Sequence, residues 1–374
     1  MRQEIAFLCQ SSRKGNGRQT GSSLEGSPTS IDPARHDLLH DILKHVSRSF
    51  YLTLNVLPWN VRDQMGLSYL FARAADTIAD SDLIDRHQRL EFLHQFRKQF
   101  VGDQVEWESI QTIQAALLPY QQESAERVLL QRLGDCFRIY RRLAAEDRQR
   151  IRELMNTLPN GMEMDLTRFQ SASGRELSAL ATLAELDRYT YFVAGCVGEF
   201  WTKMVCAHRR AMAGWDVAKM SVVGVRFGKG LQLTNILKDL ARDLQKGRCY
   251  IPEDLLRDAG LGPIDLLSAN NLPLLRPVLR HLIGIAVDHL DQGWTYTLAI
   301  PRQEIRQRLA CMWPILLAGE TLKRVSRSNE LLDPAVNVKA PRGVVYRIVA
   351  MTTLTGACGS IGTAYWGYLR KQIV

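Results

Sequence analysis

The stretch that decides the fold is "QLTNILKDLARDLQKGRCYIPED", residues 232–254. Asn235, Asp239 and Asp243 recur every four residues in it, within a run that otherwise has the apolar spacing of a buried helix. Charged side chains are costly to bury unless something offsets their charge. The pattern therefore predicts a helix that presents an acidic stripe to an interior polar site.

A second acidic pair with the same spacing occurs in "YLFARAADTIAD", residues 69–80. Asp76 and Asp80 follow an apolar run in which Tyr69 and Arg73 share one helical stripe, and the neighbouring alanines leave room for another helix or a ligand. Asp-x-x-x-Asp spacing sets two carboxylates on one helical face, about 6 Å apart. Two such stripes in buried helices indicate one shared polar cavity.

Spacing alone does not identify a site, because two further pairs have it: Asp37/Asp41 and Asp254/Asp258. The first pair adjoins an N-terminal segment that reads as disordered. The second follows Pro252, and acidic residues are favourable at the start of any helix. We therefore expect both of these pairs to be solvated helix faces and the two middle pairs to form the site.

Two facing pairs of carboxylates repel one another when nothing lies between them. Hard divalent cations relieve that repulsion, and oxygen ligands with no His or Cys nearby favour Mg²⁺ over zinc. Magnesium also keeps part of its coordination shell for water and substrate phosphates. The predicted metal ligands are therefore Asp76, Asp80, Asp239 and Asp243, and the substrate is a diphosphate. Basic residues beside the motifs are candidates for the remaining phosphate oxygens: Arg48, Arg73, Lys238, Arg248, Lys339 and Arg342.

Ionisation of an allylic diphosphate needs a site of this kind. Metal ions and basic groups stabilise the departing diphosphate, and an apolar pocket without water protects the carbocation. Aromatic faces can stabilise the cation, and we expect Tyr69 and Phe50 to do so. The other aromatic candidates, which are as readily explained as core, are Tyr51, Phe71, Tyr189 and Phe192.

The rest of the chain reads as helix. The sequence has 374 residues, 46% of them hydrophobic and 23% charged, which allows a large core. Beyond residue 33, apolar residues recur at helical spacing and β-branched alternation is scarce. We predict a disordered tail over 1–33, one all-α domain over 34–374 and a break at Pro159–Gly161. Helices are predicted near 36–56, 60–82, 85–101, 122–156, 176–212, 217–245, 274–298, 301–327 and 341–370.

The net charge of +9 implies attraction to phosphates in general. No cluster of Lys and Arg follows one exposed helix, so a nucleic-acid-binding protein is disfavoured. Seven cysteines without a C-x-x-C pair predict a reducing compartment, hence a cytoplasmic location. Residues 343–369 hold too many small and polar side chains to span a membrane well. We expect a buried helix there, with a helix lying on a membrane surface as the alternative.

Five ordered segments together resemble the squalene/phytoene synthase family over roughly residues 36–350. They are "SRSFYLTLNVLP" (47–58), "YLFARAADTIAD" (69–80), "YFVAGCVGEFW" (191–201), "QLTNILKDLARDLQKGRCYIPEDLL" (232–256) and "VKAPRG" (338–343). The resemblance implies an all-α isoprenoid-synthase fold, in which a single-domain helical bundle encloses a central apolar cavity. It also implies a Mg²⁺-dependent prenyltransferase that joins two prenyl diphosphates head to head.

The segments "SRSF" and "YFVAGCVGEFW" favour the squalene branch of the family. There, two farnesyl diphosphates give presqualene diphosphate, which is converted to squalene with hydride from NADPH. Tyr189 matches a tyrosine near the reacting carbons. Residues that match diphosphate contacts or shape the first ionisation are Ser47, Arg48, Tyr69, Arg73, Gln232, Asn235 and Arg248. Residues that match positions for the nicotinamide cofactor are Arg48, Arg73, Lys238 and Lys339.

Three departures leave alternatives open. Animal-type squalene synthases have a glutamate before the second Asp of each motif, where this chain has Ala79 and Arg242. In the basic segment, Pro341 replaces a second basic residue and Arg342 is expected to substitute for it. "GACGSIG" (356–362) is no nucleotide fingerprint. Phytoene, dehydrosqualene and hydroxysqualene synthases, which need no reductant, remain alternatives, and the basic charge and an oily product predict peripheral membrane contact.

Overall fold

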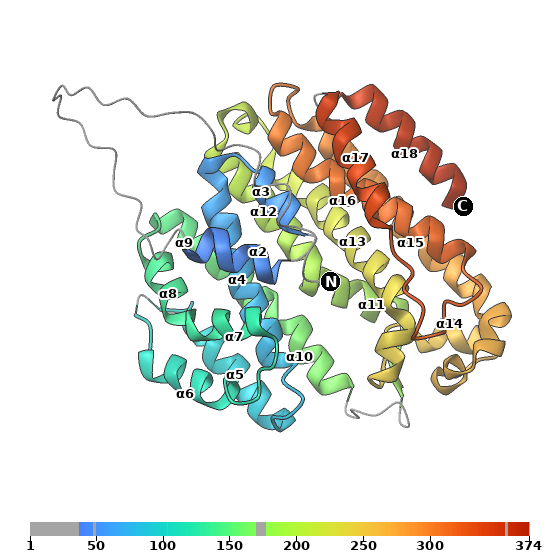
Figure 1. The fold of residues 1–374 in the computed structure, drawn as a ribbon, viewed down its shortest axis with the longest axis horizontal. Coiled ribbons are helices and arrows are strands. Elements are labelled where there is room, and N and C mark those ends of the chain that lie inside the picture. The colour runs from blue at the N-terminus through green and yellow to red at the C-terminus, as the bar shows by residue number, and fades with distance from the viewer. Residues whose placement is uncertain (1–36, 48–49, 103, 170–176, 356–357, 374) are drawn as a thin grey trace, which may run out of the picture. The chain divides into compact units, whose positions relative to one another are not determined.

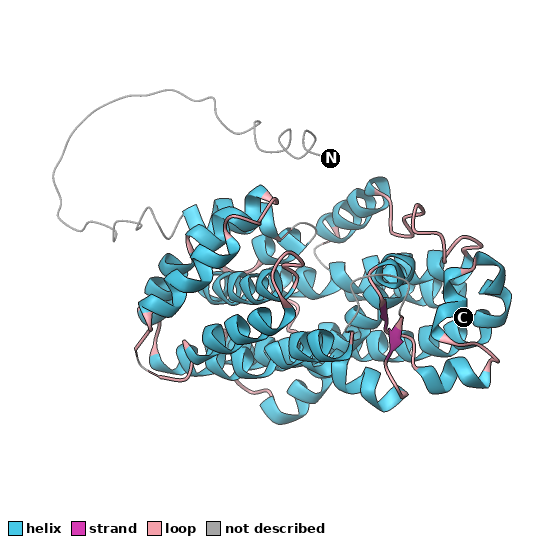
Figure 2. Cartoon of the chain, turned by 90° about the horizontal axis from the view of Figure 1, so that it is seen from below, coloured by secondary structure: helices cyan, strands magenta, loops and turns pink. Residues whose placement is uncertain are grey.

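A computed structural model describes residues 37–47, 50–102, 104–169, 177–355 and 358–373. These residues are almost entirely helical, with one pair of very short strands (Figures 1 and 2). The all-α fold class predicted from the sequence is therefore confirmed. The predicted tail over 1–33 and the predicted contact residue Arg48 lie outside the described residues.

The elements from residue 37 to residue 168 are η2 (Asp37–Ile42), α2 (Leu43–Val46), α3 (Tyr51–Val56), α4 (Trp59–Ala79), α5 (Arg86–Lys98), α6 (Trp107–Leu117), α7 (Ser124–Gln131), α8 (Leu133–Arg141), α9 (Ala145–Thr157) and α10 (Pro159–Arg168). Those that follow are β1 (Ser178–Ala179), α11 (Leu183–Thr190), η4 (Tyr191–Gly195), α12 (Cys196–His208), η5 (Arg210–Met212), α13 (Val217–Gln245), β2 (Arg248–Cys249), α14 (Glu253–Asp258), η6 (Pro263–Leu267), η7 (Ala269–Asn271), α15 (Leu272–Ala299), α16 (Ile305–Arg327), α17 (Arg342–Leu354) and α18 (Gly359–Ile373).

Two clusters of buried apolar side chains hold the domain together. The first surrounds α4 and includes Phe71, whose ring packs against Phe100 and Phe137 with centroids 4.9 and 4.8 Å away. The second surrounds α13, which packs against α12, α15 and α16 and supplies Leu237 and Leu240 to it. The two predicted acidic stripes thus belong to helices of different clusters.

Helices α12 and α13 touch through their backbones. A Cβ atom on Gly198 would lie 1.9 Å from the carbonyl oxygen of Gly224, and one on Gly228 would lie 2.2 Å from that of Ala194 in η4, the helical segment directly before α12. Only glycine permits so close an approach. The position of α13 relative to α12 is therefore fixed by steric contact.

Several predicted boundaries were wrong. The helix predicted near 122–156 is three helices, α7, α8 and α9, and α6 was not predicted. A break does fall at Pro159, since α9 ends at Thr157, but α10 was not predicted; Pro159 occupies its first turn, where the missing N–H leaves no hydrogen bond unmade. The segment predicted as helix from 176 contains β1, and α11 begins only at Leu183.

Strand β1 pairs in parallel with β2, with Ser178 opposite Arg248 and Ala179 opposite Cys249. Gly247, between α13 and β2, has a φ of 76°, which glycine adopts without steric cost. The chain therefore turns sharply after α13, and the pairing with β1 fixes the position of the Arg248 backbone.

The C-terminal region read as one helix, 341–370, is two helices, α17 and α18. Trp366 of α18 is buried, whereas Leu354 at the end of α17 is exposed. Of the helices in the described part of the chain, none is both long enough and apolar enough to cross a bilayer.

Candidate active site

The two predicted acidic stripes meet at one cavity of about 350 Å³. Asp76 and Asp80 reach it from the C-terminal end of α4, and Asp239 and Asp243 reach it from the last turns of α13. The other polar residues that line it are Asp165, Tyr189, Gln232, Asn235, Arg242, Lys246, Arg248 and Tyr250. The volume falls within the range of small-molecule sites, and its lining brings together residues from α4, α10, α11, α13 and the start of β2.

Two carboxyl groups of this cavity, those of Asp76 and Asp243, have raised pKa values. Burial, and then the neighbouring Asp80, raises the pKa of Asp76 to about 6. Burial, and then Asp239, raises the pKa of Asp243 to about 7. Both carboxyl groups ionise more readily when a cation is added, so the electrostatics favour a site for a divalent metal ion.

Basic residues from the same chain compensate part of this charge. Arg248 Nη2 donates to Asp80 Oδ1 over 3.1 Å, which ties the start of β2 to the end of α4. Lys238 Nζ lies 3.0 Å from Asp239 Oδ2 and donates to Asn235 Oδ1 over 3.1 Å. Arg242, in the place where a glutamate was expected, lies 3.6 Å from Asp239. It adds positive charge where the animal-type pattern has a carboxylate.

Asp165 of α10 is the cavity residue that the sequence analysis missed. Its Oδ2 accepts a hydrogen bond of 3.1 Å from the Tyr189 hydroxyl group, and its Oδ1 has no hydrogen-bond partner among the described residues. Burial raises the pKa of Asp165 to about 7. The rings of Tyr189 and Tyr250 stack with centroids 4.9 Å apart. A buried carboxyl group with one unpaired oxygen points to a ligand or a proton-transfer role.

A model of the family described as "Squalene/phytoene synthase" matches residues 43–343. The chain belongs to the squalene/phytoene synthase family. Membership makes it a prenyltransferase. Its described fold agrees, because the solved complex of the squalene synthase TcSQS with the ligand BPH1237 superposes with a TM-score of 0.74 at 22% identity, over 91% of this chain and 92% of that one.

Two curated members of the family show where the sequence similarity lies. The squalene synthase of Saccharomyces cerevisiae is 26% identical over 339 residues, which is 90% of this chain and 72% of the relative. The phytoene synthase of Thermus thermophilus is 39% identical, but over 107 residues, 29% of this chain and 34% of the relative. The chain is thus similar to a squalene synthase over most of its length and to a phytoene synthase, at higher identity, over a shorter segment.

Several predicted contact residues of this prenyltransferase do not line the cavity. Phe50 and Tyr69 stack with ring centroids 5.6 Å apart, and the Tyr69 hydroxyl group donates to the Val46 carbonyl over 3.4 Å. Ser47 is buried and donates to the Leu43 carbonyl. These residues form the joint between α2, α3 and α4. The apolar extension of the cavity that would need them stays a prediction.

The remaining predicted basic residues also lie elsewhere. Arg73 is paired with Asp76 and with Glu126 of α7, and it is absent from the cavity lining. Lys339 is exposed in the segment before α17, and Arg342 is the first residue of that helix. The structure therefore groups Gln232, Asn235 and Arg248 with the aspartates and leaves these three basic residues outside the lining.

Of the two acidic pairs set aside in the sequence analysis, Asp41, Asp254 and Asp258 have described side chains, and all three are absent from the cavity lining. Asp258 is exposed at the end of α14, and the Asp254 carboxylate accepts from the backbone N–H of Leu255 in the first turn of the same helix. Asp41 is exposed. Context, and not spacing, separates these pairs from the two in the site.

The aspartates at positions 76, 80, 239 and 243 do not form a complete, preformed set of metal ligands. Among the described residues, no three His, Cys, Asp or Glu side chains are close enough together to hold a metal ion. Magnesium needs only one or two carboxylates when water and substrate phosphates complete its shell. Oxygen-only donors with raised pKa values on two facing helices fit that mode of binding.

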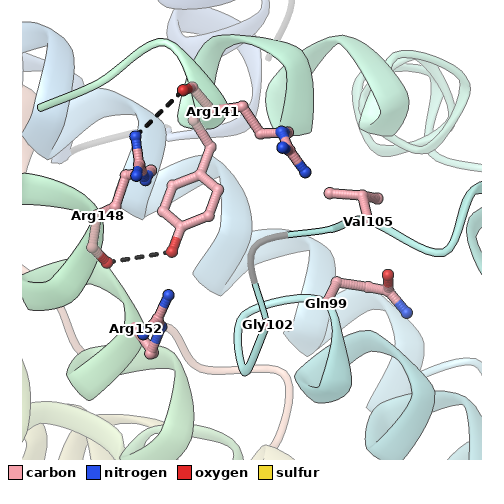
Figure 3. A pocket seen from close by; sticks show the side chains of 7 residues that line it. Gln99, Gly102, Val105, Arg141, Arg148 and Arg152 are labelled. Atoms are coloured by element: carbon pink, nitrogen blue, oxygen red, sulfur yellow. Dashed lines mark hydrogen bonds between the residues drawn. The ribbon is translucent and has the colours of Figure 1, made fainter. Parts of the chain in front are cut away.

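A second cavity, of about 80 Å³, lies between the end of α8, the start of α9 and the turn after α5 (Figure 3). Arg141, Arg148 and Arg152 border it. Arg148 Nη1 donates to the carbonyl oxygens of Leu143 over 2.9 Å and Arg141 over 3.3 Å. It thereby satisfies carbonyl groups at the C-terminal end of α8. We therefore interpret this cavity as a packing gap where helices meet.

Proposed function

We propose that this prenyltransferase joins two farnesyl diphosphates head to head, through presqualene diphosphate, to give squalene. The observation that carries the proposal is the meeting of two aspartate pairs, from α4 and α13, around one cavity that also receives Arg248. Similarity to squalene synthases over most of the chain supports the squalene branch.

Asp76, Asp80, Asp239 and Asp243 would hold Mg²⁺, which neutralises the diphosphate as it departs. The chain adds its own donors. Arg248 donates to Asp80 through one guanidinium nitrogen, Nη2. The other N–H groups of this guanidinium group would then bind phosphate oxygens. Asn235 and Gln232 offer side-chain amides from the same face of α13.

Tyr189 and Asp165 form the second half of the proposed site. Burial holds the pKa of Tyr189 well above its usual value, so its hydroxyl group stays protonated and donates to Asp165. The stacked rings of Tyr189 and Tyr250 present aromatic surface to a carbocation. Closing the cyclopropane ring of presqualene diphosphate releases a proton, and Asp165, with a pKa of about 7, is the candidate acceptor.

NADPH is proposed from the family resemblance. Of the four matching residues, Arg73 and Lys238 are paired with carboxylates, Lys339 is exposed on a segment outside the cavity lining, and Arg48 is outside the described residues. None of the three described residues lines the cavity.

A second candidate is a synthase that needs no reductant. The 107-residue segment shared with a phytoene synthase at 39% identity favours this reading, because that identity exceeds the 26% shared with the squalene synthase of Saccharomyces cerevisiae over 339 residues. Phytoene, dehydrosqualene and hydroxysqualene synthases would share the proposed diphosphate chemistry and differ in the substrate or in the fate of the last cation.

A product assay decides between these candidates. Purified protein with farnesyl diphosphate and Mg²⁺ should release pyrophosphate and form presqualene diphosphate, and squalene should appear only after NADPH is added. A C30 hydrocarbon formed equally well without NADPH would overturn the squalene proposal in favour of dehydrosqualene, and a C30 alcohol in favour of hydroxysqualene. Preferential use of a C20 diphosphate would favour phytoene.

We also propose that the protein works in the cytoplasm, in peripheral contact with a membrane. An oily product has to leave for an apolar phase, and α17 and α18 expose Tyr346, Leu354 and Tyr368. Vesicle co-sedimentation of the wild type and of Leu354→Glu tests this. Equal recovery of both proteins with the vesicles would contradict a role for this face.

A further inference from the structure

Glu126 lies against α4, the helix that carries Asp76 and Asp80. It belongs to the first turn of α7, and α7 packs on α4 (Figure 1). One carboxylate oxygen of Glu126 is paired with Arg73, and the other accepts from the Thr77 hydroxyl group over 3.5 Å and from Gln121 Nε2 over 3.3 Å. The side chain is only 12% exposed.

Arg73 joins Glu126 to the cavity. One terminal nitrogen of its guanidinium group is paired with Asp76, and the other is paired with Glu126. Asp76 follows Arg73 by three residues on α4, so both carboxylates approach the same side of the helix. Because the guanidinium fork is planar and rigid, fixing one nitrogen on Glu126 fixes where the other meets Asp76.

This arrangement gives Arg73 a role other than the direct substrate contact expected from the sequence. Its charge is shared between two carboxylates, and it does not line the cavity. A guanidinium group free of Glu126 can instead pair with both oxygens of Asp76. That two-point pair would compete with any cation for the same carboxylate.

We infer that Glu126 is a positioning residue for Asp76, acting through Arg73. It holds the guanidinium group to a single contact with Asp76 and leaves the second oxygen of that carboxylate to a divalent cation. The negative charge of Glu126 also favours a cation nearby. The inference rests on the proposed function, in which Asp76 is a metal ligand.

Replacement of Glu126 by glutamine should weaken cation binding. The amide has no charge and makes a weaker partner for Arg73, so Arg73 turns fully to Asp76. Outer partners of metal ligands commonly change metal affinity by roughly tenfold or more, and we expect about a tenfold loss. Arg73→Lys, which keeps the charge but lacks the planar fork, should also lower the affinity, because it no longer bridges both carboxylates.

The test is a titration of the full chain with Mn²⁺, followed by the electron-paramagnetic-resonance signal of the free ion. This readout does not depend on turnover or product. Glu123→Gln is the matched control, because Glu123 is exposed in the residue before α7 and its loss removes the same charge. Wild type and Glu123→Gln should bind alike, and Glu126→Gln about tenfold more weakly.

The double variant Asp76→Asn/Glu126→Gln separates positioning from a general charge effect. If Glu126 acts through Asp76, the second substitution adds no further loss once Asp76 is gone. Wild-type affinity in Glu126→Gln, an equal loss in Glu123→Gln, or a full tenfold loss in the Asp76→Asn background would each overturn the inference. If Glu126→Gln fails to fold, Arg73→Lys provides the test instead. An unchanged Mn²⁺ affinity in Arg73→Lys would overturn the inference. A wild type that binds no Mn²⁺ would remove the metal proposal itself.

Discussion

Arg248 and Asp80 are joined by a hydrogen bond of 3.1 Å although 168 residues separate them in the chain. The contact links β2, which is held by its pairing with β1, to the last residue of the α4 motif. Two parts of the cavity wall are thereby tied together by a cation, and five aspartates line the same cavity. The arrangement suits a substrate that brings its own negative charge.

Asparagine at position 80 or 243 should abolish most turnover without unfolding the protein. Each substitution removes a predicted Mg²⁺ ligand at nearly constant volume, and losing such electrostatic stabilisation costs about 100-fold or more in rate. Asp258→Asn is the control, because Asp258 is exposed on α14 away from the cavity. Pyrophosphate release and circular dichroism measure the two effects. Equal activity in all three variants would refute the site assignment.

The substitution Arg248→Lys should lower the rate of turnover by about 10-fold to 100-fold. A lysine keeps the charge, but it cannot bind Asp80 and a phosphate oxygen through one planar group. Steady-state kinetics with farnesyl diphosphate should show both a lower kcat and a higher KM. Arg257→Lys provides the comparison, since Arg257 is an exposed residue of α14 paired only loosely with Glu253, at 4.0 Å. A similar loss there would point to a non-specific charge effect.

The metal-free protein should become more stable when Asp243 is replaced by Asn, but only at high pH. The folded-state pKa of Asp243, about 7, lies above its ordinary value of 3.8. Its contribution to stability is therefore complete below that ordinary value and is lost as the pH rises through about 7. Asn does not titrate.

Urea unfolding in EDTA measures this difference. At about pH 8 the Asn variant should exceed the wild type by about 1–2 kcal/mol, a figure reduced by the partial exposure of the side chain, and at about pH 4 the two should be nearly equal. Adding Mg²⁺ at the higher pH should stabilise the wild type and remove the advantage of Asn. A difference that is the same at both pH values would contradict the prediction.

Asn at position 165 should slow turnover by about 100-fold while leaving diphosphate binding intact. The amide can still accept from Tyr189, so the local structure is kept, but it cannot take up a proton. Tyr189→Phe removes the hydrogen bond that Asp165 Oδ2 accepts from the hydroxyl group. Pyrophosphate binding by calorimetry gives the control readout. Loss of binding in Asp165→Asn would show a structural role instead.

Alanine at Gly198 should destabilise the protein by about 3 kcal/mol or more. Its Cβ would have to occupy space 1.9 Å from the Gly224 carbonyl oxygen. Gly214→Ala is the matched control, because a Cβ there meets no atom within 4 Å. Chemical denaturation of both variants measures the difference, and equal stabilities would argue against the backbone contact.

The sequence was sufficient where the signal is local. Asp76, Asp80, Asp239 and Asp243 lie within single helices, so their spacing and apolar flanks placed them correctly in one cavity. Asp165 was missed because no helix was predicted between the break at Pro159–Gly161 and residue 176, although proline fits the first turn of a helix.

Contacts between segments far apart in the chain could not be predicted from the spacing of residues in the sequence. Glu126 meets Arg73 across 53 residues, and the pair decides which way the guanidinium group points. The predicted direct substrate contact of Arg73 followed from its stripe on α4, which shows the face of the helix but not the neighbour on α7. Charge partners of this kind require the tertiary structure.

The backbone contact between α12 and α13 has a mechanical consequence. Sliding α13 along α12 by a turn would press side chains, in place of glycines, against the partner backbone. The aspartates of α13 therefore belong to a helix that cannot slide along its neighbour. Any tightening around a bound diphosphate then has to come from the other lining elements, α4, α10, α11 and β2, or from rotating side chains, and hydrogen exchange on ligand addition should change least in α13.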